Sequence, residues 1–516
     1  MIADTAITET SLTGTPMAAA MITEAAQKLH KPLTLFTPCP PASDRESWEK
    51  LSEDLKARLI KNGEQYLHYE YPSLTAVDFM EFTRTGNRSR YQDRLFARRT
   101  ALDTLVLAEC VEHRGRFLDD IINGLYLICE ENAWQLPAHN SYIRDTPQFP
   151  LPDVTRPVID LFAAETASIL AVAEYLLRSE LNEVSPFLSV MIGHELETRI
   201  FTPYLEEHFW WMGDGKSHMN NWTVWCTQNV LLSAFTRPLP SETQTRILCR
   251  AARSIDYFLE EYGEDGCCDE GAQYYRHAGL CLFGCLEILN GITDHAFSFA
   301  WKQEKIRNIA SYILNVHVDS IYYVNFADCS PVAGRCNARE YLFGKRTDNR
   351  ALMEFAASDY QNSEDPLTLD EHNLFYRLQT VFSHEEMMES DRNPVIAHKD
   401  LYYESVGLFI ARGSRLCLAV KGGDNDDSHN HNDVGSFTIY KDGKPLFIDA
   451  GVETYTKKTF SPDRYDIWTM QSRYHNLPSF TDHGRETVQQ DGGRYRAEDV
   501  RYELGEDVCR ISMDIA

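Results

Sequence analysis

The hydrophobic pattern of the chain changes its period once, and no other feature constrains the fold as strongly. From about Asp44 to about His384, apolar residues recur three and four positions apart, which is the period of amphipathic helices. Beyond about Asn393, apolar and polar residues alternate in short runs, as in strands that bury one face. The sequence therefore predicts a helical domain followed by an all-β domain.

Turn residues divide both halves into elements. The clearest helical segments are Arg98–Val111, Arg116–Glu130, Ile159–Arg178, Ser185–Phe209, Thr223–Phe235, Thr243–Glu261, Tyr274–Leu289 and Trp301–Val316. Strands are expected at Leu401–Gly407, Leu408–Arg412, Leu416–Lys421, Ser436–Tyr440, Pro445–Ile448, Arg494–Glu498 and Val508–Met513. The Asp-Gly pair in Lys441-Asp-Gly-Lys444 is typical of a tight hairpin. Alternation still continues at Ile511–Ala516, so we expect a β-sandwich that is incomplete in this chain.

A chain of 516 residues is too long for one hydrophobic core. Residues 1–42 are rich in Thr, Ala and Pro and lead into Pro38-Cys-Pro-Pro-Ala-Ser43, which indicates a tail that packs weakly. We therefore expect an N-terminal tail over residues 1–42, a helical domain over 43–390 and an antiparallel β-domain over 391–516.

The net charge of −27 restricts the partners of the protein. A strongly acidic chain is not drawn to nucleic acid or to an anionic membrane surface. An anionic polymer is compatible with this charge only if basic residues gather locally in a cleft. The number of subunits stays open, and a homo-oligomer is compatible with the sequence.

The compartment is inferred from what the N-terminus and the cysteines lack. The first residues have early acids, no basic region and no apolar run of signal-peptide length, and no membrane-spanning run follows. Thirteen cysteines without a paired CxxC arrangement favour reduced thiols, so we expect a cytoplasmic protein. Cys267-Cys268 and the Cys281/Cys285 pair are interpreted as buried thiols, although a metal or redox pair is the alternative.

Histidines and one carboxylate form the most distinctive polar set. His429 and His431 lie in an acidic loop that runs into a strand, and residues two apart share one face of a strand. Such a pair alone is more often hydrogen-bonded at a surface. Asp449, at the end of the next strand, and His475 add further ligands of the types that zinc prefers, so the four residues predict a zinc-type site.

Two helix starts carry unusual polar and aromatic groups. Asn220 and Asn221 precede an apolar helix, where one asparagine is enough for an N-cap. After Asp269-Glu-Gly, Tyr274 is followed closely by Arg276 and His277. A tyrosine near an arginine is expected to have a lowered pKa and to exchange protons, although an aromatic helix start packed on a neighbour is the structural alternative.

Several motifs in one order resemble the heparinase II/III-like group of polysaccharide lyases. They cover roughly residues 90 to 490 and are Trp134-Gln-Leu-Pro-Ala-His-Asn140, Asn220-Asn-Trp222, Asp269-Glu-Gly-Ala-Gln-Tyr274, Asn325-Phe-Ala-Asp328, Ser428-His-Asn-His-Asn-Asp-Val-Gly-Ser-Phe437, Phe447-Ile-Asp-Ala-Gly451 and Arg473-Tyr-His-Asn476. The resemblance implies an (α/α) toroid of helical hairpins joined to an antiparallel β-sandwich. It does not name the substrate.

The resemblance also implies roles for individual residues. Asn221 is expected to bind the substrate carboxylate, and Tyr274 and His429 to transfer protons. His431, Asp449 and His475 are expected to hold a zinc ion (Zn2+), interpreted as structural, with a catalytic zinc left open. One departure is Trp222, because several relatives have histidine directly after the second asparagine. Further substrate-binding candidates, for each of which a salt bridge or a packed aromatic is an equal alternative, are His139, Asn220, Trp222, Arg276, His277, Arg335, Tyr455 and Arg464.

These residue types suit β-elimination from a uronic acid. The reaction removes the C5 proton and expels the oxygen at C4, and amide hydrogen bonds to the carboxylate stabilise the enolate-like intermediate. Tyrosine and histidine on the two sides of the sugar are expected to act as acid and base. The sequence thus predicts a lyase for anionic uronate polysaccharides or oligosaccharides, and glycosaminoglycans such as heparan sulfate, chondroitin sulfate or hyaluronan are the expected substrates. A zinc hydrolase that uses His429, His431 and Asp449, and an inactive glycan-binding relative, are the alternatives.

Overall fold

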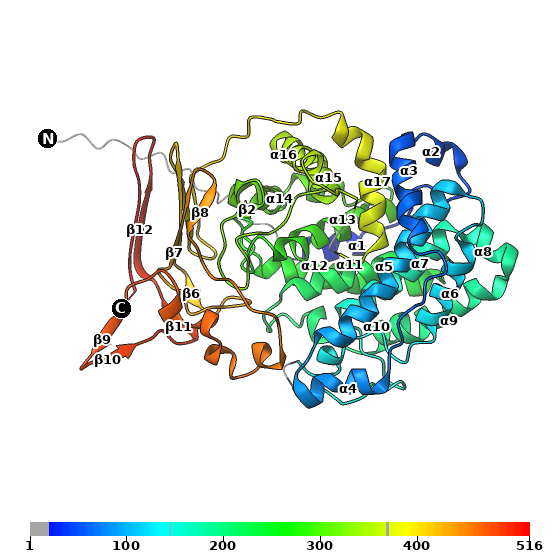
Figure 1. The fold of residues 1–516 in the computed structure, drawn as a ribbon, viewed down its shortest axis with the longest axis horizontal. Coiled ribbons are helices and arrows are strands. Elements are labelled where there is room, and N and C mark those ends of the chain that lie inside the picture. The colour runs from blue at the N-terminus through cyan, green and yellow to red at the C-terminus, as the bar shows by residue number, and fades with distance from the viewer. Residues whose placement is uncertain (1–19, 145, 368–370, 516) are drawn as a thin grey trace.

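The computed structural model describes residues 20–144, 146–367 and 371–515. Helices form the larger part of the molecule, and antiparallel strands form the smaller part beside them, with the C-terminal hairpins at the far edge (Figure 1). The predicted order of a helical domain followed by antiparallel sheets is therefore confirmed. One continuous apolar core runs through the helices and reaches Leu408, Ile410 and Tyr440 of the main sheet.

The helical part is an array of packed helical hairpins. Its α-helices are α1 (Met21–Gln27), α2 (Arg45–Glu49), α3 (Glu53–Glu64), α4 (Ala76–Thr85), α5 (Ser89–Glu112), α6 (Leu118–Cys129), α7 (Leu161–Leu176), α8 (Arg178–Val184), α9 (Pro186–Leu196), α10 (Thr202–Glu206), α11 (Asn221–Phe235), α12 (Ser241–Glu261), α13 (Gly279–Ile292), α14 (Glu304–Val316), α15 (Ala338–Arg346), α16 (Arg350–Gln361) and α17 (Leu374–Met388). Helix α11 is central, because α7, α12 and α13 pack around it and every residue of it except Trp222 is buried. No helix in the described ranges is both long and apolar enough to cross a membrane.

The strands are β1 (His317–Asp319), β2 (Tyr322–Tyr323), β3 (Leu401–Tyr403), β4 (Leu408–Arg412), β5 (Leu416–Lys421), β6 (Asp424–Asn425), β7 (Phe437–Lys441), β8 (Lys444–Phe447), β9 (Phe480–Asp482), β10 (Arg485–Thr487), β11 (Gly492–Arg496), β12 (Glu498–Leu504) and β13 (Cys509–Asp514). Antiparallel β3, β4, β5, β7 and β8 form one sheet in that order. The predicted hairpin joins β7 to β8, where Lys441 pairs with Lys444. Asp442 and Gly443 have φ values of 51° and 76°, as a two-residue turn with left-handed residues requires.

Two predicted helices differ in detail from the observed elements. The segment predicted as Ser185–Phe209 is helical from Pro186 to Glu206, but it contains a π-helical turn at Glu197–Phe201. The helix predicted at Tyr274–Leu289 begins only at Gly279, after a separate 3₁₀ turn at Tyr274–Arg276. Gly271 turns the chain before this 3₁₀ turn: its φ is 86°, and a Cβ at this position would lie 2.6 Å from the Cβ of Cys329.

The expectation of a weakly packing tail is wrong for residues 20–42. Ile22 is fully buried and donates its backbone N–H to Asp256 at 2.9 Å, and Phe36 donates its backbone N–H to the Phe235 carbonyl at 2.7 Å. The Thr- and Pro-rich composition gave no periodic signal for these few buried residues. In the structure they pack the segment against α12 and α11. Residues 1–19 of the predicted tail lie outside the described residues.

Residues 322–329 connect the helical part to the sheet. The Asn325 side-chain amide donates to the carbonyls of Cys329 and Asp449, both at 3.1 Å, so it joins the helical part to the segment after β8. The Tyr440 hydroxyl, on β7, donates to the Tyr323 carbonyl at 2.6 Å. These buried bonds fix how the 322–329 segment meets the β part, and Asp328 lies within it.

Candidate active site

The three predicted catalytic residues meet where the helical and β parts join. Asn221 is the first residue of α11, and Tyr274 lies in the 3₁₀ turn before α13. His429 lies in the loop between β6 and β7. The sequence brings these residues from three separate segments, so their proximity is a property of the tertiary structure.

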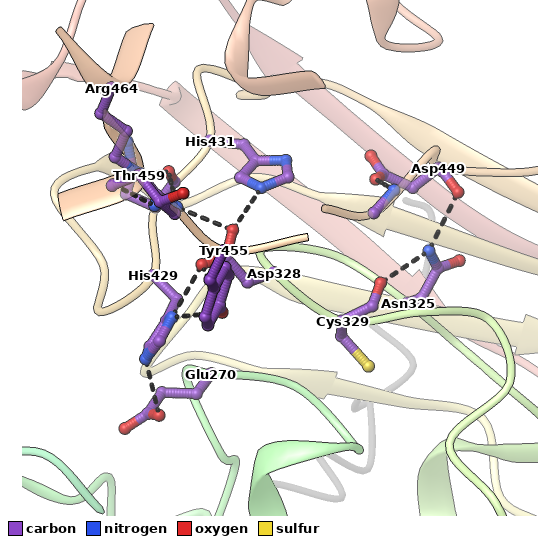
Figure 2. A network of polar contacts seen from close by, with 12 residues as sticks. Glu270, Asn325, Asp328, Cys329, His429, His431, Asp449, Tyr455, Thr459 and Arg464 are labelled. Carbon is purple, nitrogen blue, oxygen red and sulfur yellow. Dashed lines mark hydrogen bonds and ion pairs between the residues drawn. The ribbon is translucent and has the colours of Figure 1, made fainter. Parts of the chain in front are cut away.

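The Asp328 carboxylate is the centre of the site (Figure 2). Its Oδ2 accepts from His429 Nδ1 at 2.7 Å and from the Tyr455 hydroxyl at 2.9 Å. Its Oδ1 accepts from His431 Nε2 at 2.9 Å and from Arg464 Nη2 at 2.8 Å. Burial alone would raise the pKa of Asp328, but the hydrogen bonds from the two histidines and the charge of Arg464 hold that pKa well below its usual range. Asp328 is therefore ionised and fully paired.

The sequence suggested that the two histidines share one face of a strand, but the structure does not place them on a strand. They lie in a loop, and His429 has a left-handed backbone with φ of 57°, which is unfavourable for a residue other than glycine. The rings converge because they bind opposite oxygens of Asp328. A buried carboxylate, rather than strand alternation, orients them.

Tyr274 lies directly against His429. Their ring centroids are 4.4 Å apart with an interplanar angle of 29°. The Tyr274 hydroxyl is hydrogen-bonded to the Tyr455 hydroxyl, which is bonded in turn to Asp328. The expectation of a lowered tyrosine pKa is wrong, because burial raises the pKa of Tyr274 well above its usual value and outweighs the hydrogen bond from Tyr455. Tyr274 is therefore a neutral phenol that holds its proton.

Glu270 connects Asn221 to His429. Its buried carboxylate accepts from the Asn221 backbone N–H at 3.1 Å and from the Asn221 side-chain amide at 2.5 Å, and its Oε2 lies 3.4 Å from His429 Nε2. Burial raises the pKa of Glu270, although His429 and Asn221 oppose the shift. Asn220 has the simpler role of an N-cap, since its side chain accepts from the Trp222 backbone N–H at 3.1 Å.

His431, Asp449 and His475 form a buried cluster whose candidate ligand atoms all lie within 4.8 Å of one another. Among the residues that the structure describes, His431 Nδ1 and His475 Nε2 are buried there without a hydrogen-bond partner, which a bound cation would supply. Two imidazoles and one carboxylate suit zinc, and Asp328 on the far nitrogen of His431 resembles the outer carboxylate of many zinc sites. Burial alone would lower the pKa of His475, but Asp449 at 2.6 Å raises it to about 9.

His429 stands apart from this cluster. Its Nδ1 is bonded to Asp328, and its Nε2 faces Glu270, so both nitrogens have partners among the described residues. The grouping of His431, Asp449 and His475 without His429 matches the division between metal-binding and proton-transfer residues that the resemblance implied.

Three predicted substrate-binding residues lie elsewhere. Arg276 and Arg335 line a cavity of about 190 Å³ together with Arg339 and Glu371, and neither Tyr274 nor His429 lines it. Arg335 is paired with Asp359 at 2.5 Å. His277 stacks on Trp225 with ring centroids 3.9 Å apart, and burial lowers its pKa to about 3. The structure therefore does not bring Arg276, Arg335 or His277 into the Asp328 network.

The other predicted substrate-binding residues adjoin the network. Tyr455 belongs to it, and Arg464 is engaged by Asp328 and by the Thr459 and Asn430 carbonyls, which makes its role structural. His139 donates from Nδ1 to Asp160 at 2.7 Å, and its ring meets the edge of Trp222 with centroids 4.6 Å apart.

Sequence reasoning missed Asp328, Glu270 and Arg88. The two acids stand in the motifs Asn325–Asp328 and Asp269–Tyr274. For Asp328, the available signal was an acid between the apolar residues Ala327 and Cys329, whereas Glu270 directly follows Asp269. Arg88 lies in the polar run 84–90, which contains three arginines, so no local signal separates it from the others. Its Nη2 donates to His139 Nε2 at 3.1 Å.

Comparisons with known proteins bear on both parts of the chain. Residues 398–497 match the family model described as Heparinase II/III-like, C-terminal. A crystal structure of heparinase III matches with a TM-score of 0.53 and 12% identity, over 94% of this chain and 69% of that one. A mutant of the heparan sulfate lyase HepC from Pedobacter heparinus matches with a TM-score of 0.51 and 13% identity, over 95% of this chain and 68% of that one.

Another heparinase III structure has a TM-score of 0.45 and 15% identity, and this chain covers 63% of it. The chain thus spans about two thirds of the length of these solved structures. No curated protein sequence matches the chain. At such low identity the structural likeness establishes the fold, whereas the family model identifies the β part. Residues 398–497 thus match the heparinase II/III-like C-terminal family model, and the described fold is similar to that of heparinase III.

Proposed function

We propose that the protein is a polysaccharide lyase that cleaves uronate-containing glycans by β-elimination. The observation that carries the proposal is the contact between Tyr274 and His429, whose ring centroids are 4.4 Å apart. A neutral phenol and an imidazole in contact, with an amide nearby at Asn221, supply the proton donor, the proton acceptor and the carboxylate ligand that the reaction needs. The family model that residues 398–497 match and the likeness of the fold to heparinase III support the same reaction class.

The stacked arrangement bears on stereochemistry. A sugar ring does not fit between two rings in van der Waals contact. Tyr274 and His429 therefore reach the substrate from one side. The sequence had suggested that they lie on two sides of the sugar. One-sided attack requires the C5 proton and the C4 oxygen on the same face of the sugar. Glucuronate has this relationship and iduronate does not. We therefore propose glucuronate-containing glycosaminoglycans as the preferred substrates.

The zinc-type cluster contributes to this proposal as a structural element. His431, Asp449 and His475 would hold the ion, which would tie the loop of His429 to the segments after β8. The hydrolase alternative required His429 as a ligand, and the pairing of His429 with Asp328 and Glu270 favours the lyase.

A panel of glucuronate and iduronate polymers and oligosaccharides tests the proposal. A lyase leaves a 4,5-unsaturated uronate, and near-ultraviolet absorbance should therefore rise, most strongly with the glucuronate substrates. New reducing ends without absorbance would indicate a hydrolase instead. Binding without any product would indicate the inactive glycan-binding relative that Trp222 had suggested.

A further inference from the structure

Arg88 occupies a position beside the candidate site. It directly precedes α5, in the loop that follows α4. A Cβ at the neighbouring Gly86 would lie 3.3 Å from the Cβ of Lys457, so this loop abuts the segment that carries Tyr455. The charge of Arg88 acts on the hydroxyls of both Tyr274 and Tyr455. Arg88 is therefore a cation at the edge of the proton-transfer pair.

His139 holds the Arg88 guanidinium in place. Its Nε2 accepts from Arg88 at 3.1 Å, and its Nδ1 donates to Asp160 at 2.7 Å. Asp160 is fully buried and also caps α7 by accepting from the Phe162 and Ala163 backbone N–H groups. Because Asp160 binds the Nδ1 proton of His139, Nε2 of His139 is left as an acceptor. This acceptor fixes the position of Nη2 of Arg88.

The rest of the guanidinium has no partner in the described part of the chain, where His139 is its single hydrogen-bonding residue. By contrast, Arg464 donates hydrogen bonds to Asp328 and to two carbonyls, and Arg335 forms an ion pair with Asp359. Arg88 is partly buried, and a partly desolvated guanidinium without a carboxylate is unfavourable unless an anion joins it. Five donors in a planar fork suit a carboxylate.

A uronate carboxylate needs such a cation at this place. Glu270 and Asp328 give the site buried acidic groups, and the Asn221 amide already donates to Glu270. The neutral amide of Asn221 therefore does not offset the negative charge of an incoming carboxylate. The carboxyl carbon is bonded to C5, so a carboxylate whose C5 proton reaches the contacting Tyr274–His429 pair must lie beside that pair, where the charge of Arg88 acts on the Tyr274 hydroxyl.

We propose that Arg88, oriented by His139, binds the carboxylate of the uronate at the cleavage position, an assignment that rests on the proposed function. Neutralising this carboxylate makes the adjacent C5 proton more acidic. The proposal also accounts for Trp222. Its ring meets the His139 ring edge-on with centroids 4.6 Å apart, so Trp222 packs against the imidazole that orients Arg88.

The test compares Arg88→Met and Arg88→Lys with the control Arg90→Met. Arg90 is an exposed arginine two positions away, whose ion pair with Glu81 is 3.5 Å long. On an unsulfated glucuronate substrate, kcat/KM from ultraviolet absorbance should fall by at least about a hundredfold in Arg88→Met and about tenfold in Arg88→Lys, because lysine keeps the charge but loses the fork. Arg90→Met should stay within about twofold of the parent.

A binding measurement separates this proposal from the lyase proposal. In the Tyr274→Phe background, calorimetry compares a glucuronate oligosaccharide with its carboxyl-reduced analogue. The parent should prefer the carboxylate, and the preference should disappear with Arg88→Met, even if no unsaturated product forms with any substrate. A preference that survives both Arg88 variants would overturn the assignment. So would a loss of affinity confined to sulfated oligosaccharides, since Arg88 would then bind sulfate.

Discussion

His431 and Asp328 are 103 positions apart in the sequence, yet Nε2 of His431 donates to Oδ1 of Asp328 at 2.9 Å. The other oxygen of the same carboxylate binds His429 at 2.7 Å. One ionised, buried group thus orients a residue of the metal-type cluster and a residue of the proton-transfer pair. The two functions of this loop are therefore coupled through Asp328.

Asp328→Asn should impair both functions. An amide offers one accepting oxygen in place of two, so either His429 or His431 loses its acceptor. We expect a loss of about ten- to a hundredfold in turnover and in metal affinity, the usual effect of removing a carboxylate behind a metal-binding histidine. Turnover assays and elemental analysis measure the two effects. Asp482→Asn, at an exposed aspartate, is the control, and unchanged metal content and rate in Asp328→Asn would contradict the role.

Tyr274→Phe should lower turnover by at least about a hundredfold, the scale of general acid–base catalysis, with thermal stability nearly unchanged. The substitution removes only the hydroxyl that bonds Tyr455. Tyr126→Phe, at a tyrosine 50% exposed on α6, is the matched control. A Tyr274→Phe protein that turns over at the parent rate would remove this hydroxyl from the mechanism.

Substitution of Asn221 should mainly impair catalysis, whereas substitution of Asn220 should mainly reduce stability. Asn221→Ala removes the amide that meets Glu270 and should cost about 3 kcal/mol of transition-state stabilisation, comparable to one oxyanion-hole donor. Asn220→Ala removes the cap of α11 and should lower the free energy of unfolding by about 1 kcal/mol, with a smaller effect on kcat/KM. Kinetics and urea unfolding of both variants distinguish the roles. The reverse pattern would mean that Asn220 is the functional residue.

Metal content should separate the two histidines. His431→Ala removes a member of the three-residue cluster and should lose the metal and unfold at a lower temperature, because metal binding stabilises the folded state. His429→Ala should keep the metal and lose activity. Elemental analysis and thermal unfolding of both purified variants decide this. Equal metal loss in the two would make His429 a ligand and favour the hydrolase.

Glu371 should stabilise the fold in a pH-dependent way. Burial alone would raise its pKa, but the charges of Arg339 and Arg276 hold the pKa at about 2, below the ordinary value of 4.5. This stabilisation is complete above pH 4.5 and is lost as the pH falls from 4.5 toward 2. Glu371→Gln should therefore lower the unfolding temperature clearly at about pH 7 and much less at about pH 3. The exposed Glu364→Gln serves as control, and an equal loss at both pH values would rule out this linkage.

Local patterns in the sequence predicted the elements well. The period of the apolar residues identified α11, α12 and the strands β4 and β5 closely, and Asp442-Gly443 predicted the β7–β8 hairpin. These signals are local, since helix period and turn chemistry depend on residues a few positions apart. Local patterns wrongly predicted a weakly packing tail for residues 20–42, because the few buried apolar residues there, such as Ile22, stand among polar ones and form no periodic pattern.

The sequence by itself determined the order of a helical and a β part and the residue types of the site, whereas the grouping of His431, Asp449 and His475 without His429 was implied only by the family resemblance. Only the tertiary structure decided how the protons and charges are arranged. Asp328 receives four donors from distant segments, burial raises rather than lowers the pKa of Tyr274, and Arg276 lies in a separate cavity. The physical reason is that desolvation and hydrogen-bond partners depend on which distant segments pack together, and no local pattern encodes that packing.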